Sequence, residues 1–142
     1  MMKSCKKVVT FGVFDILHIG HVLLFKNAKN LPDKGEVKLI VAVQDSDYIL
    51  KYKPDTVIVN DTPTREYMVS SIRYVDEVIS YKNVDKDIQK IDFDIFAKGP
   101  DQNHEGFKRA EEWCKAHGKE VVVIPRTKGI SSSLLRRVKD LK

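Results

Sequence analysis

The chain has 142 residues, of which 42% are apolar, and its 25 basic and 20 acidic side chains leave a net charge of +5. This length suits one domain, 1–142, with a real core, and no apolar run reaches the roughly 18–20 residues that span a bilayer, which argues against membrane insertion. The lysines are spread out, without the basic stripe typical of nucleic-acid binding, so a small anionic ligand is the favoured partner.

Apolar runs rich in β-branched residues alternate along the chain with segments of helical periodicity. The run at 7–14 predicts a buried strand, and the spacing of apolar residues at 18–31 predicts a helix. The later predicted elements are a strand at 36–44, a helix at 62–75 with Thr62 as N-cap and Pro63 as its first residue, a strand at 76–81, a short helix at 85–91, a strand at 94–99, a helix at 104–118, a strand at 119–125 and a helix at 131–141. This order predicts an α/β domain: a five-stranded parallel sheet with helices on both faces.

Conspicuous polar groups follow four of the predicted strands. In open parallel sheets, ligands bind beyond the carboxyl ends of the strands, at a topological switch point. The segments that lie there are 10–21, 45–65, 98–103 and 125–133. One crevice at this edge of the sheet could collect all of them.

The stretch "TFGVFDILHIGHVLLF" (10–25) places His18 and His21 on either side of Gly20, where the first helix is predicted to begin. Free N–H groups and the positive end of the helix dipole favour phosphate at such a position. A glycine allows close approach to the backbone, and imidazoles donate hydrogen bonds. The favoured interpretation is a phosphate clamp that responds to charge in a transition state.

Three other interpretations of the histidine pair stay open at this point. A histidine at a helix terminus is often a cap or a surface residue. An H-x-x-H pair can hold a metal, although Asp15 is the one further ligand nearby. The spacing could also be accidental.

The segment "RTKGISSSLLR" (126–136) favours the phosphate interpretation. Arg126 follows a predicted strand, Gly129 comes next, and three serines stand at the start of another predicted helix. One serine would be explained as a helix cap, but three serines with a flanking arginine exceed what a cap needs.

Together, "GVFDILHIGH" and "RTKGISSS" resemble the H-x-G-H and late I-S-S/T-S/T motifs of the cytidylyltransferase-like nucleotidyltransferases, and the resemblance covers nearly the whole chain. "TREYMVSSIRYVDEVI" (64–79) and "PRTKGIS" (125–131) are most similar to the branch that transfers CMP to glycerol 3-phosphate. The resemblance implies a Rossmann-like domain and a homodimer. It also implies Mg²⁺ carried by the nucleoside triphosphate, with no metal ligands on the protein.

The resemblance also implies a role for each matching residue. Catalytic contacts fall to His18, His21, Lys53 and Arg126. Nucleotide binding falls to Thr10, Phe11, Gly12, Phe14, Gly20, Lys51, Gly99, Asp101, Thr127, Gly129, Ile130, Ser131 and Ser132. Acceptor binding falls to Asp15, Arg65 and Arg73, and Asp15 is also expected to shape the turn before the first helix. The bland alternatives are a helix-end cation for Arg73 and solvated loop lysines for Lys51 and Lys53.

Two segments depart from the pattern of that branch. The stretch from Lys51 to Arg65 is longer than expected, so either Lys51 or Lys53 could be the lysine that reaches the α-phosphate. After the fourth strand, where G-D-D is expected, the chain reads "KGPDQN" (98–103), with Pro100 in place of an aspartate. This loop borders the substrate pockets, so it bears on the identity of the acceptor.

The expected reaction moves CMP from CTP to a small phosphate monoester, glycerol 3-phosphate or similar, by direct in-line attack with release of pyrophosphate. One alternative is an adenylyltransferase that uses ATP with FMN or a sugar phosphate. Another is a non-catalytic nucleotide-binding module. The two cysteines lie far apart with no CxxC pairing, which fits a reducing compartment, and a cytoplasmic location is expected.

Overall fold

In a computed structural model, which describes residues 5–125, parallel strands form one sheet in the order β3-β2-β1-β4-β5. The strands are β1 (Cys5–Gly12), β2 (Glu36–Gln44), β3 (Glu77–Tyr81), β4 (Ile95–Lys98) and β5 (Glu120–Val123). Non-consecutive strands β1 and β4 are neighbours, so the winding reverses between them. The prediction of a five-stranded parallel sheet is confirmed.

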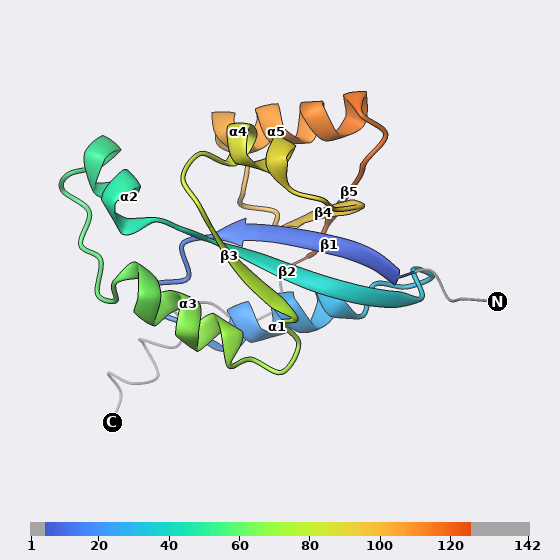
Figure 1. The fold of residues 1–142 in the computed structure, drawn as a ribbon, viewed down its shortest axis with the longest axis horizontal. Helices are drawn as coiled ribbons and strands as arrows, with labels where there is room; N and C mark the ends of the chain where they lie inside the picture. The colour runs from blue at the N-terminus through green and yellow to red at the C-terminus, as the bar shows by residue number, and fades with distance from the viewer. Residues whose placement is uncertain (1–4, 126–142) are drawn as a thin grey trace.

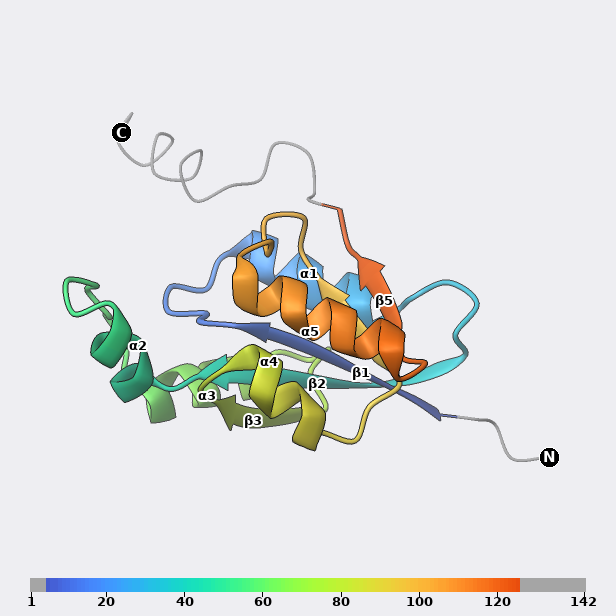
Figure 2. The same cartoon turned by 90° about the horizontal axis from the view of Figure 1, so that it is seen from above.

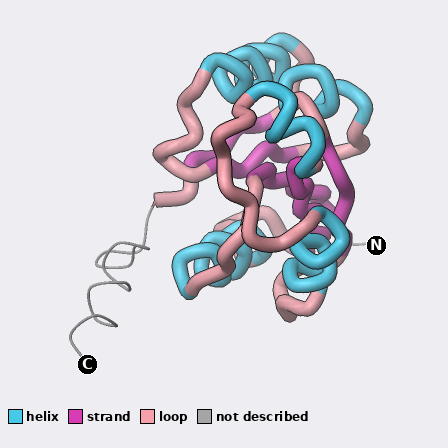
Figure 3. The backbone as a smooth tube through the Cα atoms, turned by 90° about the vertical axis from the view of Figure 1, so that its left-hand side faces the viewer, coloured by secondary structure: helices cyan, strands magenta, loops and turns pink. Residues whose placement is uncertain are grey.

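Helices cover both faces of the sheet, as predicted (Figures 1 and 3). On one face lie α1 (Ile19–Lys29) and α3 (Thr62–Ser70). On the other lie α5 (Glu105–Ala116) and the short α4 (Val84–Asp87), which continues into a 3₁₀ turn, η1 (Ile88–Lys90). A further helix, α2 (Ser46–Tyr52), lies past the carboxyl ends of the strands in both Figure 1 and Figure 2. The predicted helix at 131–141 lies outside the described residues.

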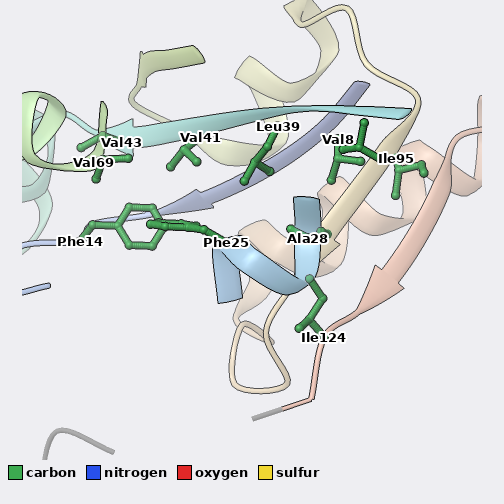
Figure 4. Close-up of a cluster of buried hydrophobic side chains, with 12 residues drawn as sticks. Val8, Phe14, Phe25, Ala28, Leu39, Val41, Val43, Val69, Ile95 and Ile124 are labelled. Atoms are coloured by element: carbon green, nitrogen blue, oxygen red, sulfur yellow. The ribbon is translucent and has the colours of Figure 1, made fainter. Parts of the chain in front are cut away.

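The core consists of two apolar clusters, one on each side of the sheet, because successive strand residues point to opposite faces. Val8 belongs to the cluster that includes Phe25 of α1 and Val69 of α3, whereas its neighbour Val9 belongs to the cluster that includes Phe107 of α5. Figure 4 shows the first cluster, in which Phe14 and Phe25 lie beneath β2. Burial on both faces explains why these strands read as continuous apolar runs.

The strands β1 and β4 part toward their carboxyl ends. The β1–β2 ladder continues to Gly12 opposite Val43, whereas the β1–β4 ladder ends with Val9 opposite Phe96. Their divergence places the opening of the sheet at the switch point, where open α/β folds bind ligands.

Local details differ from the sequence prediction. Asp61, not Thr62, caps α3, since its carboxylate accepts a hydrogen bond from the Thr64 N–H. The helix ends at Ser70 rather than at 75, because the apolar residues that follow it pack on the core from a turn. The helix α2 was not predicted, since its seven residues are too short to show a period.

Candidate active site

The structure brings most of the predicted site residues to the carboxyl edge of the sheet. They lie in four places: from the end of β1 to the first turn of α1 (Gly12, Phe14, Asp15, His18, Gly20 and His21), at the end of α2 (Lys51 and Lys53), in the first turn of α3 (Arg65), and after β4 (Gly99 and Asp101). Six predicted residues lie outside the described part of the chain: Arg126, Thr127, Gly129, Ile130, Ser131 and Ser132.

The two histidines form a reciprocal cap at the start of α1. His18 is the N-cap, and its Nδ1 accepts a hydrogen bond from the Gly20 N–H at 3.0 Å. The His21 Nδ1 in turn accepts from the His18 N–H at 3.2 Å, and the ring centroids are 4.0 Å apart. Because both Nδ1 atoms accept, each neutral ring carries its proton on Nε2. The pair therefore presents two Nε2–H donors at the helix start.

His21 is held as a neutral ring. Burial, and to a lesser degree the neighbouring His18, lowers the pKa of His21 to about 4. Near pH 7, His21 is therefore a donor without a charge of its own, and the helix N-terminus supplies the fixed positive potential.

Phe14 supports His21 from within the core. Its ring is buried and meets the His21 ring edge-on, with 5.5 Å between the ring centroids. The centroid of the Phe25 ring lies 5.1 Å away. Its backbone is left-handed, with φ of 53°, a conformation that a bulky residue rarely adopts. Gly12 makes room for this ring, since a Cβ there would lie 2.6 Å from the Phe14 Cζ. Gly12 and Phe14 therefore shape the turn that leads to the histidines.

Thr10 and Phe11 are completely buried. The Phe11 carbonyl accepts a hydrogen bond at 2.7 Å from Nε2 of Gln102, a residue that the sequence analysis missed. The Gln102 Oε1 accepts from the Gly99 N–H at 3.1 Å, so one carboxamide spans the point where β1 and β4 part. A glutamine in a polar loop carries no sequence signal for such a contact.

The side chains of Asp15 and Arg65 are used within the protein. The Asp15 carboxylate accepts from the backbone N–H groups of Val59 and Asn60, each at 2.7 Å. Arg65 is completely buried, and burial lowers its pKa against the opposing effect of nearby carboxylates. Its five N–H donors all reach protein oxygens, at the carbonyls of Val13, Gln44 and Asn60 and the hydroxyls of Ser46 and Thr62. Direct acceptor contacts by these two residues stay predictions.

Lys51 and Lys53 are exposed side chains at the end of α2. The Lys51 ammonium lies 5.5 Å from the centroid of the Tyr52 ring. Lys53 lies close enough to His104, the N-cap of α5, for its charge to help lower the pKa of that histidine after the larger effect of burial. The charge of Lys53 thus acts on the start of α5, and the choice between Lys51 and Lys53 stays a prediction.

Arg73 lies near the amino-terminal end of β3, away from the carboxyl ends of the strands. It is exposed, in the turn that leads from α3 into the start of β3. The nearby Asp76 accepts from the Leu39 N–H at 2.7 Å, and Leu39 lies ~16 Å before the end of β2 at a rise of about 3.3 Å per residue. Within one chain, the structure does not bring Arg73 to the histidines.

The described part of the chain, residues 5–125, contains neither a metal-binding cluster nor a membrane-spanning helix. In that range, no group of three or more His, Cys, Asp or Glu side chains could hold a metal ion. The helices in that range include none that is long and apolar enough to cross a membrane.

Comparison with known proteins agrees with this arrangement. The chain is 36% identical over 134 residues to the glycerol-3-phosphate cytidylyltransferase of Bacillus subtilis (strain 168), covering 92% of this chain and 95% of that one. It is 39% identical over 124 residues to the FAD synthase of Thermococcus kodakarensis, covering 84% and 79%. The solved lipopolysaccharide core biosynthesis protein from Thermoplasma volcanium GSS1 superposes with a TM-score of 0.67 at 25% identity, over 88% of this chain and 98% of that one.

The family model described as "Cytidylyltransferase-like" matches residues 9–138, and this range includes the histidine pair, the segment around Arg65, the loop after β4 and the late serine motif. The match spans nearly the whole chain. The chain belongs to the cytidylyltransferase-like family.

Proposed function

We propose that this protein transfers CMP from CTP to a small phosphate monoester, with glycerol 3-phosphate as the first candidate, and releases pyrophosphate. The observation that carries the proposal is the reciprocal histidine cap, with two Nε2–H donors at the start of α1 beside the switch point. The similarity to glycerol-3-phosphate cytidylyltransferases over almost the full length supports CTP and this acceptor.

The reaction is a direct in-line displacement. An oxygen of the acceptor phosphate forms a bond to the α-phosphorus, and the bond from that phosphorus to the α–β bridging oxygen breaks. The electron pair leaves with pyrophosphate. The attacking phosphate is already an anion near neutral pH, so the protein needs no general base, and catalysis consists of positioning and charge stabilisation.

The described residues fit these tasks. The Nε2–H donors of His18 and His21 bind the α-phosphate oxygens as negative charge builds up on them, and the exposed Lys53 reaches the triphosphate from α2. Gly20, without a side chain, lets the phosphates approach the helix start. Mg²⁺ enters as part of the nucleotide substrate and neutralises the triphosphate.

An adenylyl transfer to FMN is the second candidate. The FAD synthase of Thermococcus kodakarensis shares 39% identity with this chain, although it covers less of it than the cytidylyltransferases do. The loop after β4 also lacks the expected G-D-D, and Pro100 supplies neither an N–H nor a carboxylate. An altered loop here changes which substrate hydroxyl groups find partners, and such differences discriminate strongly.

One screen tests the proposal. CTP and ATP are each combined with Mg²⁺ and glycerol 3-phosphate, other small phosphate monoesters or FMN, and pyrophosphate release is measured. The expected result is CTP-dependent release with a small phosphate monoester. If ATP with FMN were the only pair that gave turnover, adenylyl transfer to FMN would replace the proposed function. The Pro100→Asp variant is run in parallel, and an unchanged ranking of acceptors would show that this loop does not set specificity.

The homodimer is also part of the proposal. Exposed apolar side chains gather on α2, on the segment that follows it and on α3: Tyr52, Val57, Val59, Tyr67 and Met68. These elements lie on the same side of the molecule (Figure 1). We propose that a second copy of the chain covers this face, and that the dimer works in the cytoplasm.

A further inference from the structure

The segment 53–60 connects α2 to α3 and lies mostly exposed. It belongs to the stretch from Lys51 to Arg65, which is longer than expected for the branch that transfers CMP to glycerol 3-phosphate. At its end, Asn60 meets the turn between β1 and α1, which is 45 residues away in sequence. Three hydrogen bonds join residues 59 and 60 to Asp15 in that turn.

Asn60 is held to Asp15 by two hydrogen bonds. Its backbone N–H donates to the Asp15 Oδ1 at 2.7 Å, and its side-chain Nδ2 donates to the Asp15 carbonyl at 2.8 Å. The preceding Val59 N–H donates to the other carboxylate oxygen at 2.7 Å. Both oxygens of Asp15 and its backbone carbonyl are therefore taken by residues 59 and 60.

Arg65 closes the arrangement from the other side. Its Nε donates to the Asn60 carbonyl at 3.0 Å, and one Nη donates to the Val13 carbonyl at 2.9 Å. Val13 and Asp15 are the two neighbours of Phe14, the residue with the left-handed backbone. Both sides of the unfavourable Phe14 conformation are thus anchored, and the Phe14 ring contacts His21.

The Asn60 side chain has no part in starting α3. Asp61 caps that helix with its own carboxylate, which accepts from the Thr64 N–H at 3.0 Å. The Asn60 side-chain amide instead contacts the β1–α1 turn. Loss of this amide should therefore affect that turn and His21, which the turn supports.

We propose that Asn60 is a positioning residue: together with Asp15 and Arg65 it clamps the turn 13–15, which holds Phe14 against His21 and keeps the imidazole buried and oriented. The clamp acts through His21, so its catalytic consequence rests on the proposed function. It also assigns Asp15 and Arg65 work inside the protein rather than on the acceptor.

The first measurement needs no substrate. The pKa of His21 is followed by NMR in the wild type, in Asn60→Ala and in Asp15→Asn. A loosened turn lets Phe14 withdraw and water reach the ring, so the pKa should rise from about 4 toward 6.5 by at least about one unit. The control is Asn30→Ala, which removes a side-chain bond to the Lys26 carbonyl at the far end of α1 and should leave this pKa unchanged.

The second measurement is kinetic. Asn60→Ala should lower kcat about threefold and Asp15→Asn about tenfold, with acceptor KM nearly unchanged, because a misplaced group reduces turnover rather than binding. The double variant should resemble Asp15→Asn alone, since both changes open one clamp. Asn30→Ala should match the wild type.

Several results would overturn the clamp. One is a His21 pKa within about 0.3 units of the wild-type value in both variants, since a shift of this size is far below the effect of burial. Another is a double variant whose kcat falls by the product of the two single losses, with a raised acceptor KM. This result would make Asp15 a direct acceptor contact. If the wild type releases no pyrophosphate with any pair of substrates, the proposed function fails, and the titration of His21 still decides whether the clamp exists.

Discussion

At the scale of single residues, the histidine pair shows how a short motif defines its own chemistry. Each ring uses Nδ1 as an acceptor inside the cap, and this fixes the tautomer that places a donor on Nε2. Replacing either ring leaves the helix start without one of these donors.

The first prediction concerns this donor role. His18→Ala and His21→Ala should each lower kcat by about 10²–10³, the usual effect of removing one donor that stabilises transition-state charge. Pyrophosphate release under saturating substrates measures the loss, and circular dichroism confirms the fold. Near-normal turnover in either variant would remove that histidine from the mechanism.

The second prediction concerns stability and pH. The pKa of His21 is about 4 in the folded chain and 6.5 in the unfolded chain, so the unfolded state binds more protons between these values. The contribution of His21 to stability is therefore complete above about pH 6.5 and is lost as the pH falls through 4, a loss of at most about 3 kcal/mol for this partly buried group. Urea unfolding of the wild type and His21→Gln over this range checks it. Equal slopes with pH in the two proteins would contradict it.

At the scale of elements, the turn from β1 to α1 matters more than either element alone. Gly12 ends β1 without a side chain, and the Phe14 ring occupies the space where a Cβ would stand. The ring then reaches His21 and Phe25. The turn thereby connects the end of a strand, the core and the active-site helix in one packed unit.

The third prediction tests this unit. Gly12→Ala places a methyl group 2.6 Å from the Phe14 Cζ and forces the buried ring to move, which should cost about 1–3 kcal/mol of stability, as overpacking usually does. Activity should fall as well, because the ring supports His21. Gly99→Ala is the matched control for stability alone, since a Cβ there meets nothing within 4 Å but Gly99 is itself a predicted nucleotide contact. A fully stable and active Gly12→Ala would show that the turn adapts.

At the scale of the whole molecule, the apolar face made by α2, the segment 53–60 and α3 is unusual. Val57, Tyr67 and Val59 are 85%, 75% and 64% exposed. Single exposed apolar residues are normal, but a group on one face marks an interaction surface.

The fourth prediction follows from this face. The wild type should sediment as a dimer at micromolar concentration, and Val57→Asp with Tyr67→Glu should shift it to a monomer, because charges would be buried at the interface. Cys5→Asp, an exposed position at the start of β1, is the control and should stay dimeric. A monomeric wild type would count against the proposed assembly.

Much of this protein follows from local sequence pattern. The alternation of apolar runs and helical periods predicted the parallel sheet with helices on both faces, and the family match includes the histidine motif and the late serine motif on which the resemblance was based. Caps at helix starts are also local, since His18, Asp45 and Asp61 each bond within three residues of themselves. Period and capping depend on near neighbours in the chain, so the sequence determines them locally, although the predicted cap of α3 was one residue late and α2 was too short to be recognised.

Contacts between distant segments were decided by the tertiary structure alone. Arg65 was predicted as an acceptor contact, but packing surrounds it with oxygens from two loops, from the end of β2 and from the starts of α2 and α3. The most distant in sequence is the Val13 carbonyl, 52 residues away. Gln102 reaches the Phe11 carbonyl across 91 residues. Arg73, only eight residues after Arg65, lies near the start of β3, away from the carboxyl ends of the strands. No local sequence pattern predicts these long-range contacts, because they depend on which strands become neighbours and on where two parallel strands part.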